Sequence, residues 1–349
     1  MTETMSAHGP YDAFLLVSFG GPERPEDVLP FLENVTRGRD VPRTRLLEVA
    51  EHYHHFGGAS PINAQNRQLL EAIQAELAAH GPALPVYWGN RNWHPLLEET
   101  VRRMATDGIR RALAFVTSGF ASYSGCRQYR EDIERAIAAV GPGAPRIDKL
   151  RLFYNHPHFI EAVVDRTRTA LAGLGPDQRS AAHLAFTAHS IPRSMAEASD
   201  YEMQLLDAAA LVVDALRGHH PWRVVYQSRS VPPAVPWLEP DIGDHLESLS
   251  RSGITDVVVV PIGFVSDHME VKYDLDTEAA ARARALGLRL VRAETPGTHP
   301  ALVRMVRELV LERTAGAPPR ALGDRGPAPD ACLPGCCQRG SGAVRARAS

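Results

Sequence analysis

Residues 252–266 decide the fold class, and they read SGITDVVVVPIGFVS. The central run, 256–262, is apolar throughout after its first aspartate, with no alternation of polar and apolar side chains. A strand of this kind is typical of a parallel sheet that helices cover on both faces. Similar apolar runs predict further strands at 13–17, 112–117, 183–188, 223–227 and 288–292. Amphipathic stretches with helical periodicity lie between these runs, at 63–79, 95–105, 201–216 and 301–313. The sequence therefore predicts an α/β fold.

A weak internal repeat indicates that this fold is built twice. Residues 107–122 read DGIRRALAFVTSGFAS, which matches 252–266 in the Gly-Ile before the apolar run and the Gly-Phe after it. A fainter similarity links 13–18 with 185–190. We therefore expect two similar doubly wound, Rossmann-like lobes with parallel sheets. Ligands of such sheets bind at the carboxyl ends of the strands, which predicts a cleft between the lobes.

The expected organisation is two lobes followed by a tail. The first lobe spans 11–150 and is enlarged by an insertion around 35–60. The second spans 151–314, and its last helix is expected to pack back on the first lobe. From residue 315 the composition shifts to Pro, Gly, Ala and Arg, so 315–349 is predicted to be a tail and not a further domain.

Composition excludes several classes of protein. The chain has 349 residues, of which 44% are hydrophobic and 23% charged, as in globular proteins, and a net charge of -3 leaves no basic excess for nucleic acid. No apolar run reaches the roughly 20 residues that cross a bilayer. Residues 1–10 lack the basic start and apolar stretch of a secretory signal, so a cytoplasmic protein is expected. Neither a G-x-x-x-x-G-K-[ST] loop nor a G-x-G-x-x-G after a strand occurs, so neither ATP nor NAD is expected.

Two stretches carry candidate chemistry. The first is TAHSIP, which follows the strand at 183–188 and places His189 at the carboxyl end of that strand. The second is GFVSDHMEVKYD at 263–274, which follows another strand and opens a helix. From there Glu270, Asp274 and Glu278 recur every four residues, so they share one helical face, and Asp267 and Asp276 are expected to add to its negative charge. A lone histidine is more often structural, and such acids form either a solvated face or a string of hard oxygen ligands for a divalent metal.

Five further motifs accompany these stretches in the same order as in a known family. They are SFGGP at 18–22, TRGR at 36–39, GGASP at 57–61, RNWHP at 91–95 and PWLEP at 236–240. With them, nearly the whole chain from 11 to 314 resembles the ferrochelatases, enzymes that insert Fe2+ into a porphyrin. The resemblance implies that His189 and Glu270 are the catalytic pair and face each other on one side of the ring. Asp274 and Glu278 would continue outward from Glu270 as a path for metal or protons, so all four are candidate metal ligands.

The resemblance also implies contacts with the porphyrin. Carboxylates on the ring require hydrogen-bond donors, and the matching positions are Ser60 and Tyr129, with Tyr53 and the guanidinium groups of Arg37 or Arg39 nearby. Some bacterial relatives carry a tyrosine in the first turn that ligates the product iron. Here that position is Phe19, which has no donor atom and is expected only to pack against the ring.

The four cysteines have an unusual distribution. Cys126 lies in the first lobe, whereas Cys332, Cys336 and Cys337 lie in the tail. The chain is most similar in this respect to actinobacterial ferrochelatases, which make coprohaem III from coproporphyrin III in haem biosynthesis and hold a [2Fe–2S] cluster on one internal and three C-terminal cysteines. The resemblance therefore implies such a cluster here. The alternative is that these are unused thiols on a tail.

Several alternatives to this function stay open. One is insertion of Fe2+ into protoporphyrin IX, although the lack of an apolar membrane-docking segment near the N-terminus favours the more soluble coproporphyrin III. Another is a cobalt chelatase acting on sirohydrochlorin, but such enzymes rely on two histidines where this chain has His189 and Glu270. A third is a tetrapyrrole-binding protein without turnover. The expected partners are coproporphyrin III and Fe2+, with transient contacts to neighbouring enzymes of the haem pathway.

Overall fold

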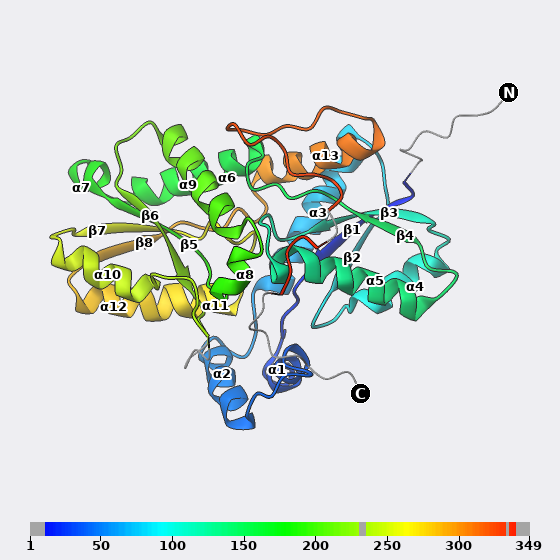
Figure 1. Ribbon diagram of the computed structural model, residues 1–349, viewed down its shortest axis with the longest axis horizontal. Coiled ribbons are helices and arrows are strands. Elements are labelled where there is room, and N and C mark those ends of the chain that lie inside the picture. Colours follow the sequence, from blue (N-terminus) through cyan, green and yellow to red (C-terminus); the bar gives the residue numbers. More distant parts are fainter. Residues whose placement is uncertain (1–10, 230–234, 333–334, 340–349) are drawn as a thin grey trace.

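The framework of the protein is two four-stranded parallel sheets (Figure 1). The computed structural model describes residues 11–229, 235–332 and 335–339, so the predicted absence of a signal in 1–10 and part of the predicted tail lie outside the described residues. The first sheet has the order β2-β1-β3-β4 and the second the order β6-β5-β7-β8. The strands are β1 (Ala13–Ser18), β2 (Val86–Asn90), β3 (Arg111–Val116), β4 (Arg146–Lys149), β5 (His183–His189), β6 (Trp222–Gln227), β7 (Asp256–Val260) and β8 (Arg289–Arg292).

Helices cover both faces of each sheet, as expected for an α/β fold. They are α1 (Val28–Val35), α2 (Arg43–His55), α3 (Ile62–His80), α4 (Leu97–Thr106), α5 (Gln128–Val140), α6 (Pro157–Ala172), α7 (Pro176–Ala181), α8 (Arg193–Glu197), α9 (Tyr201–Leu216), α10 (Ile242–Arg251), α11 (Met269–Val271), α12 (Ala280–Ala285) and α13 (Pro300–Thr314). A short 3-10 helix, Pro25–Asp27, precedes α1. Two π-helices, η2 (Tyr123–Arg127) and η3 (Lys272–Ala279), lie directly before α5 and α12.

The predicted α/β class is confirmed, and the central strands of both sheets are buried along their length. All residues of β1 and β7 are buried, which explains their uninterrupted apolar sequences. Strand β7 stops at Val260, two residues before the predicted end, because Pro261 has no N–H for the ladder. The edge strands β2 and β4 were not predicted, because their mixed polar and apolar residues lack that signal.

The two sheets are tied together by a shared core and by helix α13. One apolar cluster contains Phe14 of the first sheet and Phe186 of the second. Helix α13 packs against α3 and α6, so it spans the two halves (Figure 1). At the same place Arg307 donates hydrogen bonds to the carbonyl oxygens of His80 and Gly81, at 2.8–3.2 Å. The end of the second half is therefore anchored on a helix of the first.

The strand register makes Phe19 the counterpart of His189. Ala13 of β1 is the Cα partner of Ala112 in β3, and His183 of β5 is the partner of Val257 in β7. Phe19 and His189 each lie six residues after these paired positions, at the carboxyl end of the central strand. Topology therefore gives both residues the same place in their sheets.

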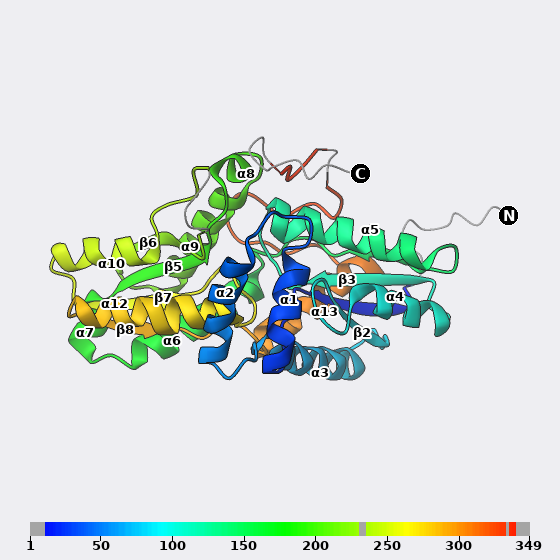
Figure 2. The same ribbon diagram turned by 90° about the horizontal axis from the view of Figure 1, so that it is seen from below.

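Helices α1 and α2 lie side by side in an extension in front of the middle of the molecule (Figure 2). Their apolar sides pack in one cluster with Met269 of α11, the residue before Glu270. In that cluster Phe31 contacts Tyr53 edge to face, with ring centroids 6.0 Å apart. The extension thus lies against the short helix that carries one member of the candidate pair.

The described part of the tail runs back across the molecule and is held by buried polar groups. Asn155 donates hydrogen bonds to the carbonyl oxygens of Leu322 and Gly326, at 3.3 and 2.9 Å. Arg151 donates to the carbonyl oxygen of Arg320 at 2.9 Å. In the residues that the structure describes, none of the helices has the length and apolar character of a membrane span.

Candidate active site

His189 and Glu270 face each other across the site. The Nε2 atom of His189 lies 3.4 Å from Oε2 of Glu270. His189 ends β5, and its Nδ1 lies 2.5 Å from the carbonyl oxygen of Ser190, to which the Nδ1–H donates. Glu270 lies in α11, and Gln227 Nε2 donates to its backbone carbonyl oxygen at 3.2 Å. The two side chains are 37% and 51% exposed, so a ligand has access to both.

The electrostatics of the pair favour a charged imidazolium next to a carboxylate. Burial alone would lower the pKa of His189, but Glu270 and the Ser190 carbonyl outweigh it and raise the pKa to about 9. Burial alone would raise the pKa of Glu270, but the facing His189 lowers it to about 2. A divalent cation at this place competes with the imidazole proton, because both bind Nε2.

The acids that follow Glu270 lie on a π-helix and not on the regular α-helix that the four-residue spacing predicts. Helix α11 is only three residues long, and η3 carries Asp274 and Glu278. The Ser228 hydroxyl donates a hydrogen bond to Asp274. Burial, together with the nearby Glu270 and Glu278 carboxylates, nevertheless raises the pKa of Asp274 to about 7. These acids are close enough to interact, and Asp274 is poised to gain or lose a proton near neutral pH.

The two other acids of this stretch have a different environment, contrary to the expectation that they add to the negative face. Asp267 and Asp276 both pair with Arg292 at the end of β8, at 3.1 and 2.5 Å. Lys272 adds a second partner for Asp276 at 2.6 Å. The Arg292 side chain is 13% exposed. The arginine therefore neutralises the back of η3 and fixes it to the sheet, while Glu270 in front has the imidazoles of His189 and His268 as partners.

The loop before α11 is held by helix α3 of the first half. The backbone N–H of Asp267 donates to Gln65 Oε1 at 2.8 Å, and Ser266 donates to Asn66 Oδ1 at 3.4 Å. Next to it, His268 places Nδ1 3.9 Å from Oε2 of Glu270. These contacts were not assigned from the sequence, although His268 lies within the quoted motif. The position of Glu270 thus depends on both halves of the molecule.

Aromatic side chains extend from the pair toward the first sheet. Burial and the nearby Glu270 carboxylate raise the pKa of Tyr53, which places this residue close to the acid. Phe31 contacts Tyr53, Trp93 and Phe19 edge to face, at centroid distances of 6.0, 6.0 and 6.3 Å. Phe19 is 36% exposed, as expected for a residue that packs against a ligand. Gly20 follows it with φ +81°, and a Cβ there would lie 2.8 Å from Cβ of Asn90, so the turn requires glycine.

The residues predicted to bind the porphyrin's carboxylates differ in how exposed they are. Ser60 is buried, and its side chain lies against Gly21. Tyr129 is also buried, beneath the guanidinium of Arg91, which lies 4.7 Å from its ring centroid. Arg37 is exposed. The same Arg91 guanidinium lies 5.7 Å from the centroid of the Phe19 ring, so this residue of the RNWHP motif contacts both aromatic rings.

The four cysteines come together although they are distant in sequence. Cys126 on η2 and Cys337 in the tail are buried in one cluster, with Cys332 and Cys336 packed against it. A hydrogen bond to Cys126 and burial raise the pKa of the Cys332 thiol, and burial with Cys332 raises the pKa of the Cys336 thiol. Gly335 and Cys337 have φ values of 84° and 51°, which lets the tail turn sharply here.

No group of three or more His, Cys, Asp or Glu side chains that could hold a metal ion is found in the described ranges. The metal-ligating roles predicted for the acids and for the cysteines therefore stay predictions.

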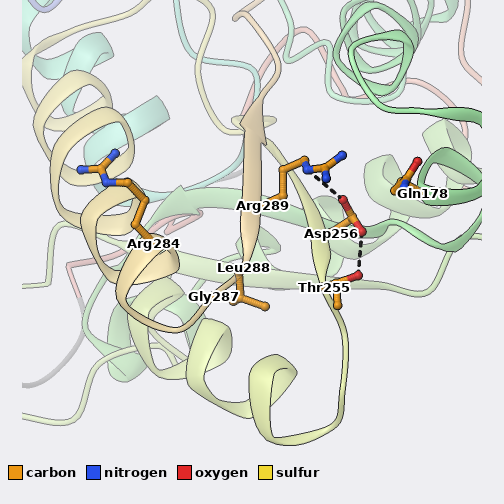
Figure 3. Close-up of a pocket in the computed structure, with 7 residues that line it drawn as sticks. All are labelled: Gln178, Thr255, Asp256, Arg284, Gly287, Leu288 and Arg289. Carbon is orange, nitrogen blue, oxygen red and sulfur yellow. Dashed lines mark hydrogen bonds and ion pairs between the residues drawn. The ribbon is translucent and has the colours of Figure 1, made fainter.

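A cavity elsewhere does not belong to this site (Figure 3). It lies at the amino ends of β7 and β8, at the edge of the second sheet opposite to His189, and its lining is mostly polar. Its Asp256 carboxylate pairs with Arg289 at 3.5 Å and accepts a hydrogen bond from Thr255 at 2.7 Å. The Asp256 carboxylate thus has its partners within the cavity.

Two parallel sheets of the same order, with a histidine–carboxylate pair at the carboxyl ends of their strands, place the protein among two-lobed α/β metal chelatases. Residues 11–314 match the family model described as Ferrochelatase, and the chain belongs to that family. Its similarity extends to the coproporphyrin III ferrochelatase of Streptomyces griseus, 55% identical with 94% of this chain and 93% of the relative covered. The coproporphyrin III ferrochelatase of Frankia alni is 57% identical, with 97% and 89% covered.

A solved structure shares the fold at low sequence identity. SirB from Bacillus subtilis with Fe3+ superposes with a TM-score of 0.54 and 15% identity, covering 88% of this chain and 97% of that one. At this identity the likeness shows the architecture alone. The predicted pair of doubly wound lobes is thereby confirmed as a chelatase fold.

Proposed function

We propose that the protein inserts Fe2+ into coproporphyrin III, giving coprohaem III in haem biosynthesis. The observation that carries the proposal is the pair His189 and Glu270, 3.4 Å apart and open to solvent, in a chain of the ferrochelatase family. The names of the relatives that cover nearly the whole chain support coproporphyrin III as the substrate.

The reaction replaces two pyrrole N–H protons with one Fe2+, so the site must take up two protons and strip water from the metal. His189 Nε2 accepts a pyrrole proton in its neutral form, and Glu270 stabilises the resulting imidazolium. The incoming Fe2+ favours that neutral form, because the cation repels the proton already on the imidazole.

The row of acids is the proposed route for metal and protons. Asp274, with a pKa of about 7, is able to pass a proton onward at neutral pH. Glu278 lies further along the same π-helix, and burial raises its pKa as well. Carboxylate oxygens are hard ligands that suit Fe2+ while it still carries water. The same acids thus lead the metal toward the porphyrin and carry protons away from it.

The porphyrin lies, in this proposal, on the aromatic side chains of the first lobe. Phe19 supplies apolar contact to the ring, while Ser60 and Tyr129, with Tyr53 and Arg37 nearby, serve the ring's carboxylates. Phe19 has no donor atom, so this turn offers no ligand to the metal.

Anaerobic metallation with Fe2+, followed by absorption, tests the reaction on coproporphyrin III and protoporphyrin IX in parallel. We expect higher kcat/KM for coproporphyrin III. Equal or better use of protoporphyrin IX contradicts the assigned substrate, and no metallation of either porphyrin contradicts the assigned reaction.

Two controls address the remaining alternatives. Co2+ with sirohydrochlorin tests the cobalt chelatase, for which the expected turnover is far below that with Fe2+ and coproporphyrin III. His189→Ala distinguishes an enzyme from a binding protein. The variant is expected to bind porphyrin normally and to lose metal insertion, whereas a non-catalytic tetrapyrrole carrier has no insertion activity to lose.

We further propose that Cys126, Cys332, Cys336 and Cys337 hold a [2Fe–2S] cluster. Four thiols are what such a cluster requires, and the gathering of all four around one buried point supports it. Each iron of such a cluster is bound by two cysteines, whereas a site for a single metal ion needs three or more ligands around one point. A bound cluster would cross-link the tail to η2 through iron–sulfur bonds.

The absorption spectrum of protein purified without oxygen tests this cluster. Bands in the visible range and two irons per chain are expected, and both should vanish in Cys126→Ser. A folded, active and iron-free preparation contradicts the cluster without affecting the proposed reaction.

The remaining assignments follow from the proposed reaction. We place the enzyme in the cytoplasm, where neighbouring haem-pathway enzymes would deliver coproporphyrin III and receive coprohaem through transient contacts. The lobes are proposed at 11–150 and 151–314, with the tail at 315–349.

A further inference from the structure

A chain of buried polar side chains joins the first sheet to the loop before Glu270. Ser18 ends β1, and its hydroxyl donates a hydrogen bond to Oδ1 of Asn90, which ends β2. The same hydroxyl oxygen accepts one from Asn66 Nδ2 of α3, at 2.9 Å. Asn66 Oδ1 in turn accepts one from the Ser266 hydroxyl at 3.4 Å, in the loop between β7 and α11. Two strand ends of the first sheet are thereby connected to the second lobe.

This network is rigid because its members are buried and fully used. Ser18, Asn66 and Asn90 are all 0% exposed. A serine hydroxyl has one donor and two acceptor sites, and Ser18 fills the second acceptor site with Trp88 Nε1, at 3.1 Å. Water cannot replace a partner in a buried network, so moving one member leaves a hydrogen bond unmade.

Gln65, the preceding residue of α3, holds the backbone of the same loop. Its Oε1 accepts a hydrogen bond from the backbone N–H of Asp267 at 2.8 Å. The Asp267 carboxylate is held by Arg292 at 3.1 Å and by the Thr295 hydroxyl, also at 3.1 Å. Asp267 is thus fixed through its backbone and through its side chain, three residues before Glu270.

The Glu270 carboxylate depends on this loop for its position. The side chain is 51% exposed, and its partners are the imidazoles of His189 at 3.4 Å and His268 at 3.9 Å. The direction of a helical side chain follows from the backbone that carries it. The place where the chain enters α11, at Met269, therefore decides where the carboxylate points.

Helix α3 also holds the second lobe at its other end. There the carbonyl oxygens of His80 and Gly81 accept hydrogen bonds from Arg307 of α13, at 2.8–3.2 Å. At 1.5 Å per residue, Gln65 and His80 lie about 22 Å apart along the helix. The contact with Arg307 therefore joins the same two lobes at a distance from the catalytic pair.

We propose that Gln65 and Asn66 are positioning residues, which fix the loop before α11 from the first lobe and with it the carboxylate of Glu270. The proposal deepens the proposed function and rests on it for the reaction. Both residues act through Glu270 and contact neither the metal nor the porphyrin. Their effect is on the chemical step, because a misplacement of about 1 Å in a reacting group is enough to slow a reaction strongly.

Steady-state metallation of coproporphyrin III by the full-length protein tests the proposal. Gln65→Leu removes the acceptor for the Asp267 N–H, and kcat is expected to fall about tenfold while KM for coproporphyrin III changes less than about twofold. Gln65→Glu keeps an acceptor oxygen and should recover part of the lost kcat. Ser266→Ala removes only the long hydrogen bond to Asn66 and should lower kcat about twofold.

Arg307→Met is the matched control, because it loosens the contact between the lobes at the far end of α3. It is expected to lower Tm and to leave kcat unchanged. An unchanged kcat in Gln65→Leu overturns the proposal, and so does an equal loss of kcat in Arg307→Met. A higher KM for coproporphyrin III with unchanged kcat in Gln65→Leu also contradicts it.

Crystal structures of wild type and Gln65→Leu provide a measurement that needs no turnover. The distance between Nε2 of His189 and Oε2 of Glu270 is expected to be longer in the variant, and an equal distance overturns the proposal. If the wild type metallates neither porphyrin, the proposed function fails, while this distance still decides whether Gln65 positions Glu270.

Discussion

The two sheets have the same order and direction but opposite chemistry at their carboxyl ends. In each, the strand order is equivalent, and a π-helix comes after the third of the four strands in chain order, η2 after β3 and η3 after β7 and the short helix α11. The first π-helix carries Cys126 and Arg127 and lies among arginines, whereas the second carries Asp274 and Glu278. At the end of the central strand, Phe19 in one sheet corresponds to His189 in the other.

This difference shows how one topology supports two tasks. Parallel strands bring loops from each sheet to one edge, whatever the loops contain. Cationic and aromatic residues on the first sheet suit the flat, acidic porphyrin, and anionic residues on the second suit Fe2+. Because the anionic residues lie on the second sheet and the cationic residues on the first, the route for the metal is separate from the groups that bind the porphyrin's carboxylates.

The largest expected effect comes from substituting His189, and its counterpart Phe19 provides the comparison. His189→Ala should lower kcat for Fe2+ insertion about a thousandfold, because it removes the proton acceptor. Phe19→Leu should change kcat less than about threefold while raising KM, because it removes only apolar contact. Steady-state metallation checks both variants. A loss of kcat in Phe19→Leu as large as in His189→Ala would break the division of tasks.

Next in size is the loss of the arginine behind η3. Arg292→Met should lower the free energy of unfolding by about 3 kcal/mol, because Asp267 loses its cation and Asp276 keeps only Lys272 as a partner. Urea denaturation measures this. The exposed pair of Arg282 and Glu247 provides the control, since Arg282→Met should cost less than about 0.5 kcal/mol. Equal effects of the two variants would show that Arg292 does not fix the acidic π-helix.

A pH effect of about 1–2 kcal/mol between pH 8 and pH 6 should arise in the second sheet. Burial, with the positive charge of Arg223, lowers the pKa of His183 to about 4, and burial, with the charges of His183 and Arg223, does the same for the pKa of His245; the two Nε2 atoms lie 3.0 Å apart. The unfolded chain takes up these protons around the ordinary histidine pKa of about 6.5, whereas the folded chain does so only near pH 4, so stability falls as the pH falls from 8 to 6. Unfolding of wild type and His245→Leu between pH 8 and pH 6 checks it, and the variant should have the shallower slope. Identical slopes would exclude the pair as the cause.

The smallest effects are expected from two serines, Ser60 on the side of the first sheet and Ser228 on the side of the second, and their kinetic effects should differ. Ser60→Ala should raise KM for coproporphyrin III about fivefold without changing kcat, because it removes one hydrogen bond to the substrate. Ser228→Ala should lower kcat by a similar factor and leave KM unchanged, because its hydroxyl contacts Asp274. The same changes in KM and kcat for both variants would contradict separate tasks for the two sides.

Much of this site was predictable from local pattern, and the failures have definite causes. His189 and the strand before it were predicted because a buried parallel strand is apolar along its whole length. The edge strands β2 and β4 were missed because half-exposed strands mix residue types. Asp267 and Asp276 were taken for part of the acidic face, because a sequence pattern shows spacing but not the partner that Arg292 supplies from another strand.

The sequence by itself determined the α/β class, the repeated plan and the order of the ferrochelatase motifs, because these depend on residues close together in the chain. Tertiary structure alone decided the distance between His189 and Glu270, the π-helical form of the acidic segment and the gathering of the four cysteines. The cysteines lie as far apart in the chain as Cys126 and Cys337. These features depend on packing and buried ion pairs, which no local pattern records.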